Sequence, residues 1–311
     1  MRESLDIRTI EHLANRLGCS VEELQDVARS LGRHYRCFEI ERKGKQRPIR
    51  QARGALETLQ GRINDLLQSL PWPQEFQGGI RRRSARTNAT RHCGATHVLQ
   101  ADIKDFFPSI RPEMVYRAFV GSGCSPDVAR MLTMLTTFEH CVPQGAKSST
   151  VVANLVLWHR SFERFRGAAE ARRAALTLYV DDLTVSGQRS VGGMQKVAEG
   201  ILQQSGLTAK REKTEVGPVT ERTVVTGYRP TPDGLRMPQG YVRQVETQIE
   251  EFARTASTMD PQKRKNTQRS ILGRIRYVAT AEPEEARRLF ELLPKSWSLA
   301  TADPRQNAPP G

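Results

Sequence analysis

The sequence of 311 residues lacks any hydrophobic run long enough to cross a bilayer. Its longest apolar stretches, such as residues 151–158, fall far short of the roughly 20 residues that a transmembrane helix needs. The first residues, Met-Arg-Glu-Ser, contain no apolar signal core, and the five cysteines are scattered without a Cys-x-x-Cys pair. These absences argue against a membrane protein, a disulfide framework and a zinc site, and they predict a protein of the reducing cytoplasm.

Acidic residues are scarce relative to basic ones, with 34 Asp and Glu against 48 Lys and Arg and a formal net charge of +14. A surplus of this size indicates a polyanionic partner, either nucleic acid or an anionic membrane surface. The deficit is sharpest between Glu75 and Asp102, where no acidic residue accompanies five arginines: Arg81, Arg82, Arg83, Arg86 and Arg91. A solvated basic loop is one interpretation of this segment. We favour a surface that contacts phosphates, because no carboxylate compensates the charge.

Hydrophobic residues make up 38% of the chain, which is enough for one large domain or two to three modules. Hydrophobic spacing predicts two short helices before residue 35, for which helix–turn–helix DNA binding is an alternative to plain packing. Ser109 and Ser125 are expected to be helix N-caps. Further elements are a basic hairpin over 35–49 turning at Lys43-Gly44, strands over 98–103, 176–180 and 183–186, and helices over 55–70, 149–166, 193–205 and parts of 241–295.

Two carboxylate sites are associated with predicted strands. Asp102 ends an apolar strand, and the adjacent Asp181 and Asp182 join two short strands far along the chain. A tight hairpin can hold two carboxylates next to a neighbouring strand's carboxylate, but like charges in one site raise each other's pKa. Two Mg²⁺ ions about 4 Å apart would relieve that repulsion and clamp the attacking and leaving oxygens of a phosphoryl transfer. The alternative is an ordinary hairpin turn, in which aspartate is common.

The order of four segments resembles the palm of reverse transcriptases: Leu99-Gln-Ala-Asp102-Ile-Lys-Asp-Phe-Phe107, Val142-Pro-Gln144-Gly145, Tyr179-Val-Asp181-Asp182 and Gly206-Leu with Lys213-Thr214. More narrowly, the chain resembles bacterial retron reverse transcriptases. Residues 88–92 match the Asn-Ala-x-x-His element of that lineage, and residues 225–227 match its Val-Thr-Gly element. The likeness extends from about residue 35 to about residue 294.

The resemblance implies a role for particular residues. The metal site, for two Mg²⁺ or Mn²⁺ ions, would comprise Asp102, Ile103, Asp181 and Asp182. Phe107 would exclude a ribose 2′-OH, with Phe106 as a core aromatic, and Lys213 would approach the leaving pyrophosphate. The full set expected to contact the deoxynucleoside triphosphate is Lys45, Arg47, Phe107, Gln144, Gly145 and Lys213.

A second set of residues is expected to contact RNA or DNA. Its members are Arg81, Arg82, Arg83, Asn88, His92, Val225, Thr226, Gly227 and, on a basic helix, Lys263, Arg264 and Arg269. Asn88 and His92 carry the chemistry that reads unstacked bases. The alternative is that Asn88 caps a turn and that His92 is a structural histidine.

The chain departs from the family pattern at three places. The loop after Gln144-Gly145 lacks both usual prolines and carries Lys147, which would add a charge beside the nucleotide. Lys210 stands where the family usually has Asn, and Ala52 where the fingers usually have Pro. These departures bear on lineage and pocket rigidity and leave the three aspartates untouched.

The expected fold is an α+β right-hand polymerase with a small antiparallel palm sheet and a helical thumb. The expected parts are an N-terminal helical segment over 1–34, fingers over 35–98, a palm with inserted fingers helices over 99–228, a thumb over 229–300 and a disordered tail over 301–311.

The resemblance implies a retron RNA-directed DNA polymerase that copies part of a dedicated structured non-coding RNA into single-stranded DNA (msDNA). Priming would start from an internal RNA 2′-OH, and the role would be antiphage defence with a separate effector protein and no membrane partner. Alternatives are a group II intron relative or other defence-associated reverse transcriptase, and a catalytically silent RNA-binding scaffold. We expect no maturase or endonuclease domain after the thumb, which argues against the intron relative. Retention of all three aspartates argues against the scaffold.

Overall fold

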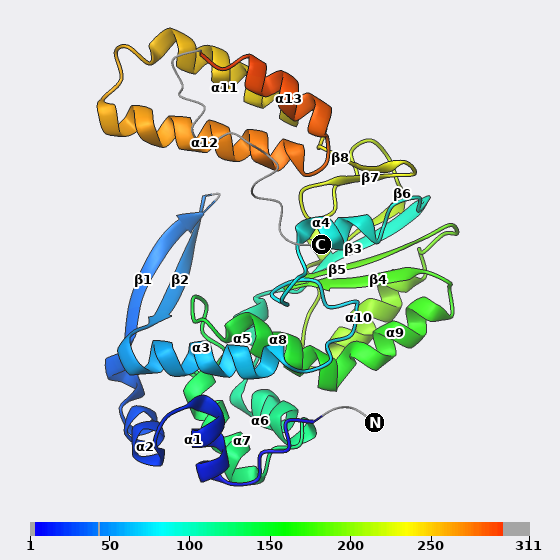
Figure 1. Cartoon of the computed structure of the whole chain (residues 1–311). Coiled ribbons are helices and arrows are strands. Elements are labelled where there is room, and N and C mark those ends of the chain that lie inside the picture. Colours follow the sequence, from blue (N-terminus) through cyan, green and yellow to red (C-terminus); the bar gives the residue numbers. More distant parts are fainter. Residues whose placement is uncertain (1–3, 43, 295–311) are drawn as a thin grey trace. The chain divides into compact units, whose positions relative to one another are not determined.

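The computed structural model describes residues 4–42 and 44–294 (Figure 1). These residues form two compact units. The first, here called the sheet unit, contains the chain up to Ser84 together with Thr96–Pro218. The second, the helical unit, contains Ala85–Ala95 and the described residues from Val219 onward. The predicted tail over 301–311 and the turn residue Lys43 lie outside the described residues.

The sheet unit begins with the two predicted helices, α1 (Ile10–Leu17) and α2 (Val21–Arg29). Ser20 caps α2, since its hydroxyl accepts a hydrogen bond from the Glu23 amide at 3.1 Å. A 3-10 helix (Leu31–His34) leads into the predicted hairpin of β1 (Tyr35–Arg42) and β2 (Lys45–Ala52). The helix α3 (Gly54–Gln68) follows.

Most helices of the sheet unit come between its strands along the chain. Ser125 caps α7 as predicted, but Ser109 caps no helix, because it ends α5 and the following helix begins three residues later after Arg111. The predicted helix at 149–166 continues to residue 170 through a π-helical turn. The elements are α5 (Phe106–Ser109), α6 (Pro112–Gly121), α7 (Pro126–Thr136), α8 (Ser149–Leu157), the π turn (Trp158–Phe162), α9 (Glu163–Glu170) and α10 (Met194–Gln204).

A four-stranded antiparallel sheet gives this unit its name. Its strands, in spatial order, are β4 (Ala175–Tyr179), β5 (Asp182–Gly187), β3 (His97–Asp102) and β6 (Glu215–Pro218). The first three confirm the predicted strands, while β6 was not predicted. The interior strands β3 and β5 are largely buried, although both include polar residues, and helix α9 packs against the edge strand β4 (Figure 1).

The helical unit combines a short helix, a hairpin and three longer helices. The helix α4 (Ala85–Thr90) and the hairpin of β7 (Arg229–Thr231) and β8 (Gly234–Arg236) were not predicted from the sequence. The helices α11 (Tyr241–Thr255), α12 (Pro261–Ala279) and α13 (Pro283–Glu291) confirm the prediction for 241–295. They share a separate apolar core that includes Ile249, Phe252 and Ile275.

The described chain is therefore a mixed α and β protein with small antiparallel sheets, as expected. No helix in the described ranges has both the length and the apolar content needed to cross a membrane.

Candidate active site

Three carboxylates meet at one end of the four-stranded sheet. β3 ends at Asp102, β5 begins at Asp182, and the pairing register places these two residues directly opposite each other. Asp181 lies in the turn that precedes β5, where the Ile103 amide donates a hydrogen bond to its backbone carbonyl at 2.9 Å. Val180 makes that turn with a positive φ of 60°. The chain thus brings together the two predicted carboxylate sites, and the buried side chain of Ile103 leaves only its backbone available to a ligand.

The electrostatics of the cluster are unfavourable without a cation. Desolvation by the surrounding protein, with smaller contributions from the charges of Asp181 and Asp102 and an opposing one from Lys213, raises the pKa of Asp182 to about 6, although the residue is partly exposed to solvent. Burial and the charge of Asp102 also raise the pKa of Asp181, against the opposing effects of its own backbone hydrogen bond, Lys213 and Arg47. Negative charge concentrated in this way favours binding of a divalent cation.

Two lysines lie against Asp102. Lys213 Nζ is 2.7 Å from Asp102 Oδ2, and this hydrogen bond is the main reason that the pKa of Lys213 is raised. Lys210 Nζ is 3.8 Å from the other oxygen, Oδ1. A 3-10 helix (Arg211–Lys213) follows Lys210 and places both side chains on the same side of the sheet end. Sequence reasoning assigned Lys213 to this site but treated Lys210 only as a departure from the family.

The donor set fits a hard divalent cation. Across the part of the chain that the structure describes, no three His, Cys, Asp or Glu side chains already converge as a coordination shell. The side chains of Asp102, Asp181 and Asp182 nevertheless offer only carboxylate oxygens, the ligands that Mg²⁺ and Mn²⁺ prefer. Desolvation and, to a smaller extent, mutual repulsion raise the pKa of Asp182, and a bound cation would remove the repulsion.

A loop over residues 75–78, which was not predicted as part of the site, is hydrogen-bonded to the hairpin that carries Asp181 and Asp182. The Gln77 amide donates to the Leu178 carbonyl at 2.7 Å, and the Leu178 amide donates to the Glu75 carbonyl at 2.7 Å. Asn154 Nδ2 in turn holds the Gly78 carbonyl at 2.8 Å. A Cβ atom on Gly78 would lie 2.5 Å from the Val180 backbone nitrogen, so only glycine permits this approach. The adjacent glycines Gly78 and Gly79 are the sequence feature that could have predicted this close approach.

The residues expected around the nucleotide come from several segments of the sheet unit. Phe107 is half-buried beside the buried Phe106, with ring centroids 5.5 Å apart. The Gln144 carbonyl accepts a hydrogen bond from the Arg50 amide at 2.8 Å, which ties this loop to β2. Gly145 follows with a φ of 108°, a conformation that favours glycine. The nucleotide contacts of these residues stay predictions.

The basic residues of the hairpin and of the following loop differ in what they contact. Arg47 is exposed on β2, and its charge acts on the pKa of Asp181. Lys45 begins the same strand, and its side chain lies outside the described residues. Lys147 pairs with Glu57 on α3 at 3.0 Å, and its effect on the nucleotide stays a prediction.

The arginine-rich segment divides into structural and exposed side chains. Arg83 donates hydrogen bonds to the carbonyls of Trp72 at 2.7 Å and Phe76 at 2.6 Å, and also to that of Pro73. Arg81 and Arg82 are exposed, and Arg81 pairs with Asp65 at 2.5 Å. Contact with nucleic acid stays a prediction for all three, and the geometry favours Arg82 over Arg83.

In the helical unit, the two retron-like elements pack together. Asn88 and His92 are 0% and 1% exposed, and Asn88 Nδ2 donates to Thr226 Oγ1 at 3.2 Å. Thr226 Oγ1 donates to the Ala85 carbonyl at 2.8 Å, so the second element closes over the start of α4. Burial lowers the pKa of His92 to about 3, with a smaller contribution from Arg91, which keeps the imidazole neutral.

The neighbouring Val225 is buried, and the Gly227 carbonyl accepts a hydrogen bond from Tyr277 Oη at 2.8 Å. These contacts favour a structural role for both elements. Direct contact with RNA remains a prediction for Asn88, His92 and residues 225–227.

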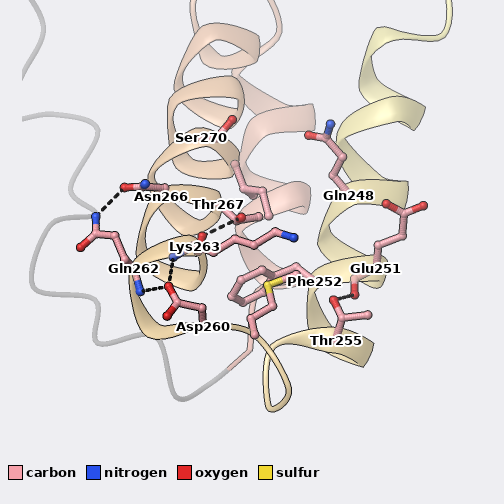
Figure 2. Close-up of a pocket in the computed structure, with 12 residues that line it drawn as sticks. Gln248, Glu251, Phe252, Thr255, Asp260, Gln262, Lys263, Asn266, Thr267 and Ser270 are labelled. Carbon is pink, nitrogen blue, oxygen red and sulfur yellow. Dashed lines mark hydrogen bonds between the residues drawn. The ribbon is translucent and has the colours of Figure 1, made fainter.

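The basic helix α12 presents different residues on different sides. Ile271 and Ile275 form its buried face, whereas the exposed Lys265 and Arg269 recur one turn apart on the opposite face. Lys263 instead lines a groove of about 730 Å³ between α11 and α12 (Figure 2). The predicted set Lys263, Arg264 and Arg269 therefore does not share one face.

The raised pKa of Asp182 predicts a pH-dependent gain in stability for Asp182→Asn. Because the folded-state pKa lies above the unfolded value, the stabilising protonated form is lost as the pH rises through about 6. At about pH 8, with a chelator present, we expect the variant to be more stable than the wild type by about 1 kcal/mol, since partial exposure screens the repulsion. Urea unfolding should show that gain shrink below pH 6 and vanish near pH 4. Asp233→Asn, in the exposed turn between β7 and β8, is the matched control; an equal gain there would contradict the prediction.

Comparisons with known proteins agree with this geometry. The family model described as reverse transcriptase (RNA-dependent DNA polymerase) matches residues 39–273. The Escherichia coli Retron Ec86 reverse transcriptase is 34% identical over 219 residues, covering 66% of this chain and 66% of that protein. The Myxococcus xanthus Retron Mx65 reverse transcriptase is 34% identical over 236 residues, covering 67% of this chain and 55% of that protein.

A third relative, the Escherichia coli Retron Ec48 reverse transcriptase, is 29% identical over 267 residues, covering 80% of this chain and 65% of that protein. The chain thus spans between about half and two thirds of the length of these relatives. The resemblance to retron reverse transcriptases predicted from the sequence is confirmed by these matches. With the family model covering most of the chain and three carboxylates gathered at the end of its sheet, the protein belongs to the reverse transcriptase family.

Proposed function

We propose that this protein is the RNA-directed DNA polymerase of a retron. The observation that carries the proposal is the juxtaposition of Asp102, Asp181 and Asp182 at one sheet end, with Lys213 hydrogen-bonded to the cluster. Such a cluster can direct cations at the oxygens of a phosphoryl transfer, and a basic chain can hold the nucleic acid. The similarity to retron enzymes supports the choice of template and lineage.

The proposal assigns parts of a right hand to the two units. The four-stranded sheet is the palm, the β1–β2 hairpin with the helices before and after it belongs to the fingers, and α11 to α13 are the thumb. In the sheet unit, Arg47, Gln144, Gly145 and Phe107 bind the incoming deoxynucleoside triphosphate, and Lys213 approaches its leaving group. Arg47 is exposed, and its charge acts on Asp181, which supports a position near the proposed site.

Two Mg²⁺ ions, or Mn²⁺ in their place, complete the proposed site. Reverse transcriptases generally use divalent metal ions, and here Asp102, Asp181 and Asp182 would hold them. When bound, the ions stabilise the charge that develops on the attacking and leaving oxygens. Lys213, whose Nζ lies 2.7 Å from Asp102 Oδ2, is the residue that would donate a proton toward the leaving pyrophosphate.

The finer part of the proposal concerns the RNA. The enzyme copies part of a dedicated structured non-coding RNA into single-stranded DNA, priming from an internal 2′-OH, in antiphage defence with a separate effector protein. Because Asn88 and His92 are buried and Asn88 is hydrogen-bonded to the half-buried Thr226, we infer that these residues shape the helical unit. Any selectivity for one RNA then comes from the shape and charge of that unit.

The decisive test is the nucleic acid made in cells that contain the native neighbouring locus. The expected product is a short single-stranded DNA joined to RNA, with a branch that survives RNase as a small adduct. A pure protein that carries no specific RNA and makes only random cDNA would refute the retron assignment and leave the polymerase standing. Specific RNA binding without any DNA synthesis would identify a silent RNA-binding scaffold.

Lys265→Gln with Arg269→Gln should weaken template–primer binding and flatten its dependence on salt. Each lost phosphate contact lowers the slope of log K against log salt by roughly 0.7 to 0.9, so the pair should lower it by about 1.5. Fluorescence anisotropy over a range of salt concentrations measures this slope. Lys263→Gln, in the groove of Figure 2, is the control and should change the slope less. An unchanged slope in the double variant would mean that this face of α12 contacts solvent.

A further inference from the structure

We propose that Lys210 is a positioning residue that, as the second ammonium on Asp102, sets how tightly the active site binds its divalent cations. The inference rests on the proposed metal site. It concerns a residue to which the proposed function assigns no task. Its basis is the different way in which Lys210 and Lys213 are held beside the same carboxylate.

The backbone fixes Lys210 next to Asp102. The Lys210 amide donates a hydrogen bond to the Asp102 carbonyl at 2.8 Å, and the preceding residue Ala209 forms a β-bridge with Ile103. The backbone from which the Lys210 side chain projects is therefore hydrogen-bonded directly to Asp102 at the end of β3. Its Nζ reaches to 3.8 Å from Asp102 Oδ1, and the side chain is only 22% exposed.

The Lys213 side chain is more exposed to solvent than that of Lys210. Its Nζ lies 2.7 Å from Asp102 Oδ2, but its side chain is 52% exposed and projects from a 3-10 helix of three residues. A long side chain with that exposure can turn into water when a cation arrives. Lys210 has less room to leave, because most of its stem is covered by protein.

The two lysines together lie against both oxygens of Asp102. A divalent cation that binds Asp102 must displace these ammonium groups or share the carboxylate with them. Like charges within a few ångströms repel, and the repulsion grows where water is partly excluded. Since Lys213 can withdraw, the repulsion that persists in the loaded site comes from Lys210, and it weakens cation binding.

The experiment is Mn²⁺ titration of the full chain, freed of nucleic acid, followed by electron paramagnetic resonance of the unbound ion. The pH should be about 8, which is above the raised pKa of Asp182. Lys210→Gln removes the charge and shortens the side chain by only one atom, and we expect Mn²⁺ to bind about fivefold more tightly. Lys210→Arg keeps the charge and should bind Mn²⁺ as the wild type does. The Mg²⁺ concentration for half-maximal primer extension should fall by the same factor in Lys210→Gln.

Three controls separate the possible failures. Lys196→Gln removes a charge from an exposed position on α10 and should leave Mn²⁺ affinity unchanged, which excludes an effect of net charge. Asp102→Asn should weaken Mn²⁺ binding strongly; if it does not, the proposed metal site is wrong. If Asp102→Asn weakens binding but Lys210→Gln matches the wild type, only the role of Lys210 is refuted. An equal gain in Lys210→Arg would also refute it. Should Lys210→Gln unfold, Lys210→Met carries the same expectation.

Discussion

Replacing Asp181 and Asp182 together by Asn should abolish primer extension, with a loss of at least about 10³-fold. Both residues lie at the tip of the hairpin opposite Asp102, and their charges, rather than the fold, hold the proposed cations. Asn keeps the size of each side chain and removes the charge whose desolvation, together with repulsion from the neighbouring aspartates, raises the pKa of Asp182 to about 6. Single-turnover extension of an annealed DNA primer on an RNA template measures the effect.

The same double variant should still bind template–primer, because phosphate contacts on basic residues elsewhere in the chain are unchanged. Asp233→Asn, on the turn between β7 and β8, provides a matched charge change and should keep wild-type extension. Substantial extension by the double variant would place the reaction centre elsewhere in the chain.

Gly78→Ala should produce the second large effect, since it adds one methyl group beneath the active-site turn. That atom would lie 2.5 Å from the Val180 nitrogen and 2.8 Å from the Tyr179 carbonyl carbon, both of which belong to the backbone. The hairpin or the loop must move, and such overpacking typically costs about 1–3 kcal/mol. We expect lower stability in urea unfolding together with a loss of primer extension larger than the loss of stability explains, because the displaced turn carries Asp181.

Gly167→Ala is the matched control for this change. Gly167 lies within α9, where an added Cβ meets nothing within 4 Å, so alanine should stabilise the helix by up to about 1 kcal/mol. Full stability and full extension in Gly78→Ala would show that the loop gives way at no cost and that its approach to the hairpin does not position the carboxylates.

Local signals were sufficient to predict the core of the candidate site. Apolar runs on either side of Asp181 and Asp182, with an apolar strand before Asp102, indicate strands without knowledge of their partners. The structure pairs these strands in the register that brings the carboxylates together. The capped helix that starts after Ser125 was predicted from equally local signals, because Ser and Pro there match the ordinary start of a helix.

Elements that depend on distant partners were not predicted. β6 has only four residues, including Gly217 and Pro218, and it is a strand because it pairs with β3. The six residues of α4 are too few to be stable alone and pack against the β7–β8 hairpin. The position of Lys210 beside Asp102 could not be predicted either, because it follows from a backbone pairing between segments far apart in the sequence.

The split composition of the helical unit governs the order in which the protein can be completed during synthesis. Residues 85–95 leave the ribosome more than a hundred residues before Val219, yet their partners are Thr226, the Thr231 carbonyl and the Thr280 carbonyl. During synthesis, Asn88 therefore lacks the residues that bury it until the four-stranded sheet of the other unit has been made. A fragment that begins at Val219 would lack α4, and one that ends at Pro218 would leave α4 without its core. The helical unit can therefore be completed only late in translation. Cleavage of the chain at one position cannot separate this unit intact from the sheet unit.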